Sequence, residues 1–161
     1  MKQSSTPQQA YERMADRCAR AEYCSGEVRE RLRRQGLSAA DALAITERLQ
    51  RERFIDDGRY ARAFVRQKSG YSRWGRRKIA AALAAKRVDR AIIAEAMTEI
   101  SPEAYAEGLR ALLAAKARSH GPDALATYDG RTRLFRFAAS RGFETTAIAA
   151  ALRVLIEAAE E

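Results

Sequence analysis

The sequence has few of the residues from which metal sites, disulfide frameworks and β-hairpins are built. Among 161 residues it contains one histidine, His120, and two cysteines, Cys18 and Cys24. Two cysteines with no third or fourth ligand nearby argue against a zinc site and are typical of the reduced thiols of a cytoplasmic protein. Nine glycines and three prolines are too few for a hairpin-rich β protein or a long flexible linker. His120 has no partner in the sequence, and we assign it no role.

Long apolar runs and catalytic motifs are missing as well. No run approaches the roughly 20 apolar residues that span a bilayer, and the polar start of the chain is unlike a signal segment, so we expect a cytoplasmic protein without membrane contact. The sequence contains no phosphate-binding loop ending in Gly-Lys-Ser or Gly-Lys-Thr, no paired-histidine metal motif and no serine elbow. We therefore expect a non-enzymatic protein that holds no metal and no cofactor.

Asp56 and Asp57 are neighbouring acids that could be read as a catalytic pair. They directly precede a predicted helix, where aspartate accepts hydrogen bonds from free amides and suits the helix dipole. We interpret both as helix-capping, structural residues, and we expect Tyr60 and Phe64 to pack on one face of that helix. A nuclease that uses the two carboxylates stays open as an alternative. A metal-dependent activity that is lost in the double alanine variant would support it.

Positive charge is concentrated in the middle third of the chain. The formal net charge is +9. Residues 59–90 hold eleven Lys or Arg and one acid, Asp89, whereas the segments on either side are nearly neutral. Such a block predicts a polyanionic partner, which could be nucleic acid, a nucleoprotein or an acidic protein surface. A solvated helix face without a partner is the alternative.

Nearly every segment has the apolar period of an amphipathic helix, which predicts an all-α fold of nine helices. Residues 119–128 are predicted to form a loop. Capping residues predict helix starts at Thr6-Pro7, Ser25, Ser38, Asp56 or Asp57, Ser72, Asp89 and Ser101.

The nine helices fall into threes, which suggests an internal repeat. Four positions recur in the second helix of each group: Val28, Ile79 and Leu134; Leu32, Leu83 and Ala138; Gly36, Arg87 and Gly142 at the helix end; and Leu37, Val88 and Phe143 after it. The predicted domains are three-helix repeats at residues 7–53, 56–100 and 102–158, of which the second is basic. Tandem units of this kind predict an elongated, curved module that suits a groove or filament.

Several stretches resemble a known family. Residues 54–65, FIDDGRYARAFV, resemble the central signature F-I-D-D-x-x-Y-A-x-x-F of RecX proteins. Residues 74–79, WGRRKI, followed by Leu83, are similar to that family's G-x-x-K-I-x-x-x-L. Residues 20–36 resemble its first repeat and residues 140–148 its third, so the resemblance covers about residues 10–155 in matching order.

The resemblance implies a regulator of the RecA recombinase. It implies tandem three-helix repeats that bind RecA filaments on single-stranded DNA, along the filament groove. It also implies inhibition of filament extension and of the ATPase, strand-exchange and coprotease activities, with roles in DNA repair, homologous recombination and the SOS response. Arg87 departs from the family, in which glycine is common at this position. Because a left-handed cap costs arginine about 1 kcal/mol, we expect this helix to end differently and Arg87 to be free for a contact.

Basic residues and the single tryptophan are the candidate contact residues. Arg59, Arg62 and Arg66 are predicted to form one stripe, and Arg73, Arg76 and Arg77 a second on the next helix. Trp74 could stack on a base or anchor a protein interface, although packing between helices is the simpler reading. The candidate filament- and DNA-binding residues are Arg59, Arg62, Arg66, Lys68, Arg73, Trp74, Arg76, Arg77, Lys78, Lys86, Arg87, Arg131, Arg133, Arg136 and Arg141.

The expected partners are the RecA filament and single-stranded DNA, with double-stranded DNA also open, and the protein is expected to be a monomer. The alternative is a stand-alone helical DNA-binding protein, which the short turn at residues 36–38 permits. Against it, no helix presents an obvious set of base-reading side chains. Sequence-preferring duplex binding without RecA would favour this alternative.

Overall fold

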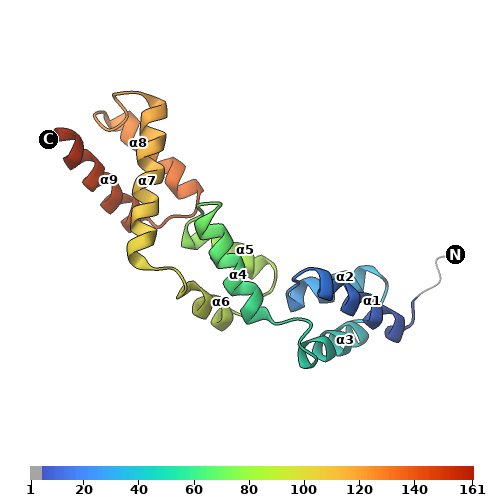
Figure 1. Cartoon of the computed structure of the whole chain (residues 1–161). Coiled ribbons are helices and arrows are strands. Elements are labelled where there is room, and N and C mark those ends of the chain that lie inside the picture. The colour runs from blue at the N-terminus through green and yellow to red at the C-terminus, as the bar shows by residue number, and fades with distance from the viewer. Residues whose placement is uncertain (1–4) are drawn as a thin grey trace. The chain divides into compact units, whose positions relative to one another are not determined.

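The computed structural model describes residues 5–161, which form nine α-helices and no strand (Figure 1), so the predicted all-α class is confirmed. The helices are α1 (Pro7–Arg20), α2 (Ser25–Arg34), α3 (Ala39–Arg51), α4 (Asp57–Gly70), α5 (Arg76–Ala85), α6 (Arg90–Met97), α7 (Pro102–His120), α8 (Tyr128–Ser140) and α9 (Thr145–Glu160).

Short polar side chains start several of the helices, because they satisfy amides that have no partner within the helix. The capping bonds run from Gln9 N–H to Thr6 Oγ1, from Asp41 N–H to Ser38 Oγ, from Arg59 N–H to Asp56 Oδ1 and from Ala104 N–H to Ser101 Oγ, at 3.0 to 3.3 Å. In α1 the Gln9 side chain also accepts from Thr6 N–H, which completes a capping box.

The helices α2, α5 and α8 end in the same turn. The residue that closes each turn has a positive φ, which is 92° at Gly36, 62° at Arg87 and 92° at Gly142. The N–H groups of Leu37, Val88 and Phe143 donate to the carbonyls of Leu32, Leu83 and Ala138, each at 3.2 Å. This is the Schellman motif. The expectation that α5 ends differently is therefore wrong, because Arg87 adopts the left-handed conformation.

Two predicted helix starts are wrong. The helix expected to begin near Ser72 begins at Arg76, because Arg73 takes a left-handed φ of 52° and turns the chain. Ser25 does not cap α2: Cys24 occupies the N-cap position without a side-chain capping bond, and Ser25 donates to Asp57 instead. The predicted 119–128 loop is also too long at its start, since α7 continues to His120.

The described chain separates into two compact units. Unit one runs up to Ala63 and includes Leu83–Ala96, and unit two consists of Phe64–Ala82 and Met97–Glu161. These units differ from the three predicted repeats, whose boundaries at 7–53, 56–100 and 102–158 stay a prediction.

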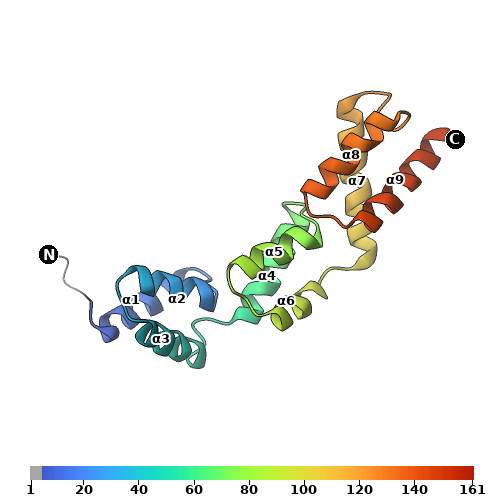
Figure 2. The same ribbon diagram turned by 180° about the vertical axis from the view of Figure 1, so that it is seen from behind.

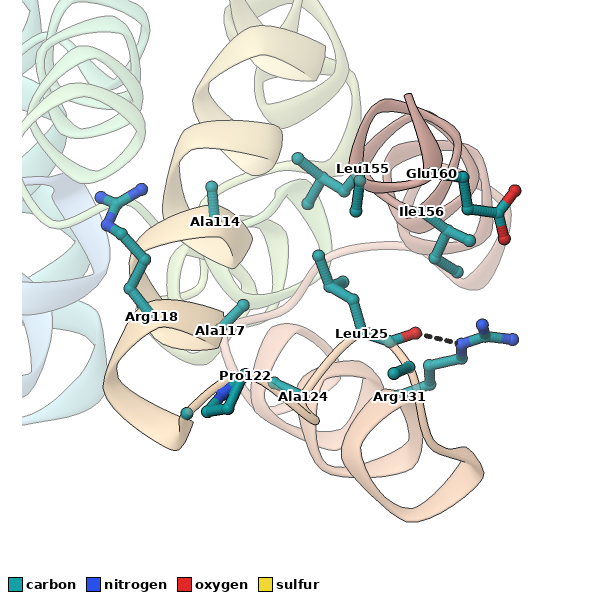
Figure 3. Close-up of a pocket in the computed structure, with 13 residues that line it drawn as sticks. Ala114, Ala117, Arg118, Pro122, Ala124, Leu125, Arg131, Leu155, Ile156 and Glu160 are labelled. Carbon is teal, nitrogen blue, oxygen red and sulfur yellow. Dashed lines mark hydrogen bonds between the residues drawn. The ribbon is translucent and has the colours of Figure 1, made fainter.

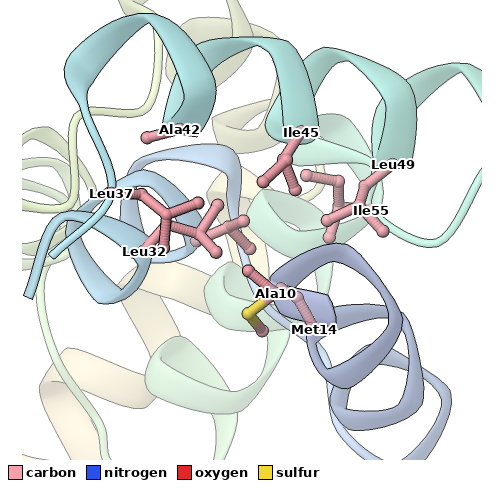
Figure 4. Close-up of a cluster of buried hydrophobic side chains, with 9 residues drawn as sticks. Ala10, Met14, Leu32, Leu37, Ala42, Ile45, Leu49 and Ile55 are labelled. Carbon is pink, nitrogen blue, oxygen red and sulfur yellow. The ribbon is translucent and has the colours of Figure 1, made fainter. Parts of the chain in front are cut away.

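Each unit has its own apolar core. In unit one, Met14 of α1, Leu32 of α2 and Leu49 of α3 are buried together (Figure 4). In unit two, α7, α8 and α9 pack against one another (Figure 2) and bury Leu113 and Leu134 completely. Full burial of a leucine side chain stabilises a fold by about 1.5–3 kcal/mol.

Both units contain a joint between the start of one helix and the end of another. In unit one, a Cβ on Gly26 of α2 would meet the carbonyl oxygen of Lys86 at the end of α5. In unit two, Gly75 N–H donates to the Arg141 carbonyl at 2.7 Å and Arg77 N–H to the Gly142 carbonyl at 3.0 Å. The free amides at a helix start thus find the free carbonyls at the end of α8, which satisfies both.

Candidate functional site

Trp74 lies in the turn between α4 and α5, within unit two, and not on α5 as predicted. The backbone N–H of Trp74 donates to the Lys68 carbonyl at 2.8 Å, which ties the turn back onto the end of α4. The indole meets the Phe64 ring edge-on, with centroids 6.4 Å apart and planes at 71°. The ring is half-buried, so packing holds it in place while part of it stays open to solvent.

Two lysines converge on the same indole. The Lys68 Nζ lies 4.5 Å and the Lys78 Nζ 4.4 Å from the ring centroid. Both distances are within cation–π range. Neither ammonium has a carboxylate partner among residues 5–161.

Other candidate cations form ion pairs with nearby carboxylates. Arg59 pairs with Glu22 at 3.1 Å and Lys86 with Glu27 at 3.2 Å in unit one. In unit two, the exposed side chain of Arg66 lies 3.5 Å from Glu99. An exposed pair such as Arg66–Glu99 contributes about 0–1 kcal/mol. All three pairs reduce the charge available to a partner.

Arg76 turns inward rather than lying on the predicted basic stripe. Its guanidinium stacks over the Tyr105 ring at 4.0 Å and lies 3.6 Å from the Glu144 carboxylate. Its backbone N–H donates to the Tyr105 hydroxyl, which donates in turn to Glu144 at 2.8 Å. Burial, followed by the hydrogen bond to Glu144, raises the pKa of Tyr105. Since Tyr105 and Glu144 are distant in sequence, no local pattern predicted this cluster.

Arg131 and Arg141 are held by backbone carbonyls. Arg131 Nε donates to the Leu125 carbonyl at 2.6 Å (Figure 3). Both residues line a groove of about 730 Å³ between α7, α9 and the loop that precedes α8. Arg141 donates to the Ser72 carbonyl at 3.4 Å and lies over Phe137. Both side chains therefore support local structure.

The remaining candidates carry no acid partner within the described part of the chain. Arg73, Arg77, Arg133 and Arg136 of unit two are exposed, as is Arg87 of unit one. Together with Lys68 and Lys78, these are the cations that the fold leaves available to a polyanion. Arg62 is excluded from this set, because it is half-buried and, beside the hydrogen bond from Arg59 N–H, its positive charge helps to lower the pKa of Asp56.

The two aspartates at the start of α4 have structural contacts. Asp56 caps the helix, and its hydrogen bond from Arg59 N–H lowers the pKa of its carboxyl group. Asp57 accepts from both the N–H and the hydroxyl of Ser25, which ties α4 to α2. Tyr60 contacts Glu27, and burial followed by that contact raises the pKa of its phenol. Residues 5–161 contain no cluster of three metal-ligating side chains.

None of the helices between residues 5 and 161 is both long and apolar enough to cross a membrane.

Comparisons with known proteins agree with one another. Residues 56–97 match the family model described as "RecX, second three-helix domain". A curated protein of Pelodictyon phaeoclathratiforme (strain DSM 5477 / BU-1), named "Regulatory protein RecX", is 30% identical over 130 residues, which are 81% of this chain and 78% of that protein.

Two solved structures share the fold. "Crystal structure of regulatory protein RecX" superimposes with a TM-score of 0.78 at 22% identity, covering 88% of this chain and 68% of that one. "Crystal structure of RecX from Lactobacillus salivarius" gives 0.80 at 20% identity, covering 92% and 96%.

The capped helices, together with cations that have no acid partner among residues 5–161, define an all-helical protein with a cationic surface around one tryptophan. The sequence identity with the curated relative identifies the family within this class. The chain belongs to the RecX family of regulatory proteins.

Proposed function

We propose that this protein binds the RecA filament on single-stranded DNA and inhibits filament extension and the ATPase, strand-exchange and coprotease activities. Membership of the RecX family is the observation that carries the proposal. The cationic surface is consistent with it, because a filament of protein on DNA presents phosphates and acidic side chains.

The proposed contacts are the cations that have no acid partner within the described residues 5–161. In unit two these include Lys68, Arg73, Arg77 and Lys78, which lie on or beside the turn between α4 and α5. Arg59, Arg66, Arg76 and Lys86 take part in internal ion pairs, so we assign them a smaller share of binding than the sequence predicted.

The proposed mechanism is steric and electrostatic. Three helical repeats contact neighbouring RecA subunits, so that several weak contacts reinforce one another. A monomer bound across subunits hinders subunit addition or the motions linked to ATP turnover. In this mechanism the nucleotide is bound and hydrolysed by RecA.

The test is the single-stranded-DNA-dependent ATPase of the cognate RecA, measured with this protein at substoichiometric amounts. Inhibition well below one protein per RecA is expected. The Arg73→Glu/Arg77→Glu variant should inhibit at least several-fold less at equal helix content. Arg76 is left intact because its substitution would disturb Tyr105 and Glu144.

The matched control reverses two exposed arginines outside the proposed surface, Arg51→Glu and Arg153→Glu. It has the same change in net charge and should inhibit like the unchanged protein. Full ATPase activity on intact filaments with the unchanged protein present would refute the proposed function. Equal losses in both double variants would mean that net charge matters and the assigned surface does not.

A further inference from the structure

A groove of about 440 Å³ lies beside Trp74, between the end of α4 and the first turns of α7. Trp74 and Arg73 contribute to one wall, and Tyr105 and Phe143, whose ring centroids are 5.2 Å apart, line the groove as well. This groove lies entirely within unit two. Neither the sequence pattern nor the contacts of Trp74 taken alone point to it.

Small residues keep the groove open. Gly70 and Gly108 both line it, and a Cβ built on either would meet no atom within 4 Å. Gly108 stands in the interior of α7, where glycine costs about 1 kcal/mol of helix stability relative to alanine. Helix formation therefore does not explain glycine at position 108, whereas the open space of the groove does.

Positive charge gathers where the groove meets the tryptophan. Lys68 and Lys78 place two ammonium groups within 4.5 Å of the indole centroid, and neither has a carboxylate partner in the described chain. The exposed Arg73 adds a third cation at the groove. Like charges held around one ring repel each other, and an anion between them would relieve that repulsion.

We propose that this groove receives an unstacked base of single-stranded nucleic acid, which packs on Trp74. The flexible Lys68 and Lys78 side chains then move from the ring to the neighbouring phosphates, which Arg73 also contacts. An aromatic side chain beside cations that follow a phosphate backbone is the usual arrangement for binding single strands. Bases in a duplex are stacked and paired, so they cannot enter a groove of this kind. The inference deepens the proposed function and rests on its DNA contact.

A protein side chain is the competing occupant, and the charge argues against it. A protein anchor usually fills a fully desolvated pocket at the centre of an interface, where charged residues are depleted. This groove instead includes the exposed side chains of Arg73 and Glu107. The Glu107 carboxylate suits an acceptor for the amino or imino N–H groups of a base.

The test uses the full chain without RecA and a short oligo(dT) strand. Trp74 is the only tryptophan, so its fluorescence reports this one site. Saturable quenching that is reversed by salt is expected, because a stacked base quenches indole emission and the phosphate contacts are screened. Binding seen by anisotropy of a labelled strand, without any change in Trp74 emission, would overturn the proposal.

Gly108→Leu fills the groove and keeps Trp74 as the reporter. Leucine is a better helix former than glycine, and the position has room for a side chain, so the variant should fold. We expect it to lose the quenching and to bind oligo(dT) roughly 5- to 150-fold more weakly, which is the range for removing one base–aromatic stack. Ala115→Leu, at an exposed position on the same helix, is the matched control and should bind normally.

Lys68→Gln and Lys78→Gln test the phosphate contacts. Each should reduce the slope of log affinity against log salt by about 0.7, the value for one phosphate contact on a single strand. Lys116→Gln is the control, since Lys116 also lies over an aromatic ring, that of Phe137, but away from the groove. Unchanged slopes in both groove variants would overturn the assignment.

The RecA ATPase assay separates this inference from the proposed function. If the groove holds a base, Gly108→Leu should weaken oligo(dT) binding whether or not the protein inhibits RecA. If Gly108→Leu instead reduces ATPase inhibition while oligo(dT) binding and quenching stay unchanged, the groove takes a protein side chain. The base-binding proposal is then wrong, and the proposed function stands.

Discussion

The backbone of Gly75 packs directly against the backbone of Gly142, so that a Cβ on Gly75 would meet the carbonyl carbon of Gly142. The amides of Gly75 and Arg77 donate to the carbonyls at the end of α8 across this contact. A side chain cannot be added there without separating the two helix ends. The joint therefore depends on glycine at position 75 for space, although no positive φ requires it.

We expect Gly75→Ala to lower the free energy of unfolding by about 1–3 kcal/mol, the usual cost of overpacking. Urea unfolding followed by circular dichroism measures it. Gly70→Ala is the control, because a Cβ at Gly70 meets nothing within 4 Å. Its stability should be unchanged or slightly higher. Equal stability of both variants would show that the backbone contact is looser than described.

Arg87 closes α5 in the left-handed conformation that glycine adopts at the ends of α2 and α8. Arg87→Gly should therefore raise the free energy of unfolding by up to about 1 kcal/mol, since an L-residue pays for this conformation. Arg87→Ala removes the same charge but keeps the Cβ, so it should give no comparable gain. If both variants gain equally, relief of charge repulsion and not backbone conformation is responsible.

The buried Ser25 donates twice to the Asp57 carboxylate, which links the starts of α2 and α4. Asp57→Ala leaves both donors without this acceptor and should cost about 1–3 kcal/mol. Ser25→Ala removes only the hydroxyl and should cost less. A double-mutant cycle between them should give a coupling of about 0.5–3 kcal/mol. A coupling of zero would show that the two residues act independently.

Cys24 is fully buried beside Glu27, and burial is the main reason that its pKa rises from 9.0 to about 11. At pH 8 the thiolate fraction should be about 100-fold below that of an ordinary thiol, so iodoacetamide should modify Cys24 slowly. Peptide mass spectrometry measures the rate, with the unfolded protein as the reference. The half-buried Cys18 should react faster in the folded protein.

The same shift gives a pH dependence of stability. The folded-state pKa is raised, so the contribution of the neutral thiol is complete below pH 9 and is lost as the pH rises through about 11. The unfolding free energy of the unchanged protein should fall more steeply over this window than that of Cys24→Ala. Parallel curves would contradict the raised pKa.

Local chemistry predicted most of the helices and their caps. Thr6, Ser38, Asp56 and Ser101 cap helices as their sequence contexts predicted, because an N-cap needs only its own side chain and an amide up to three residues away. The failure at Ser72 is different in kind. There the chain turns at Arg73 and α5 starts beside Gly142, a contact made across more than sixty residues.

The amino-acid sequence by itself determined the all-α class, the cationic middle third and most of the helix caps, because periodicity, charge and capping act over a few residues. Only the tertiary structure decided which cations remain available. It turned Arg76 toward Tyr105 and Glu144, and it placed Lys68 and Lys78 around Trp74 with no acid partner among residues 5–161. The physical reason is that an ion pair or an open groove depends on groups brought together from distant segments, and such distances are set by packing.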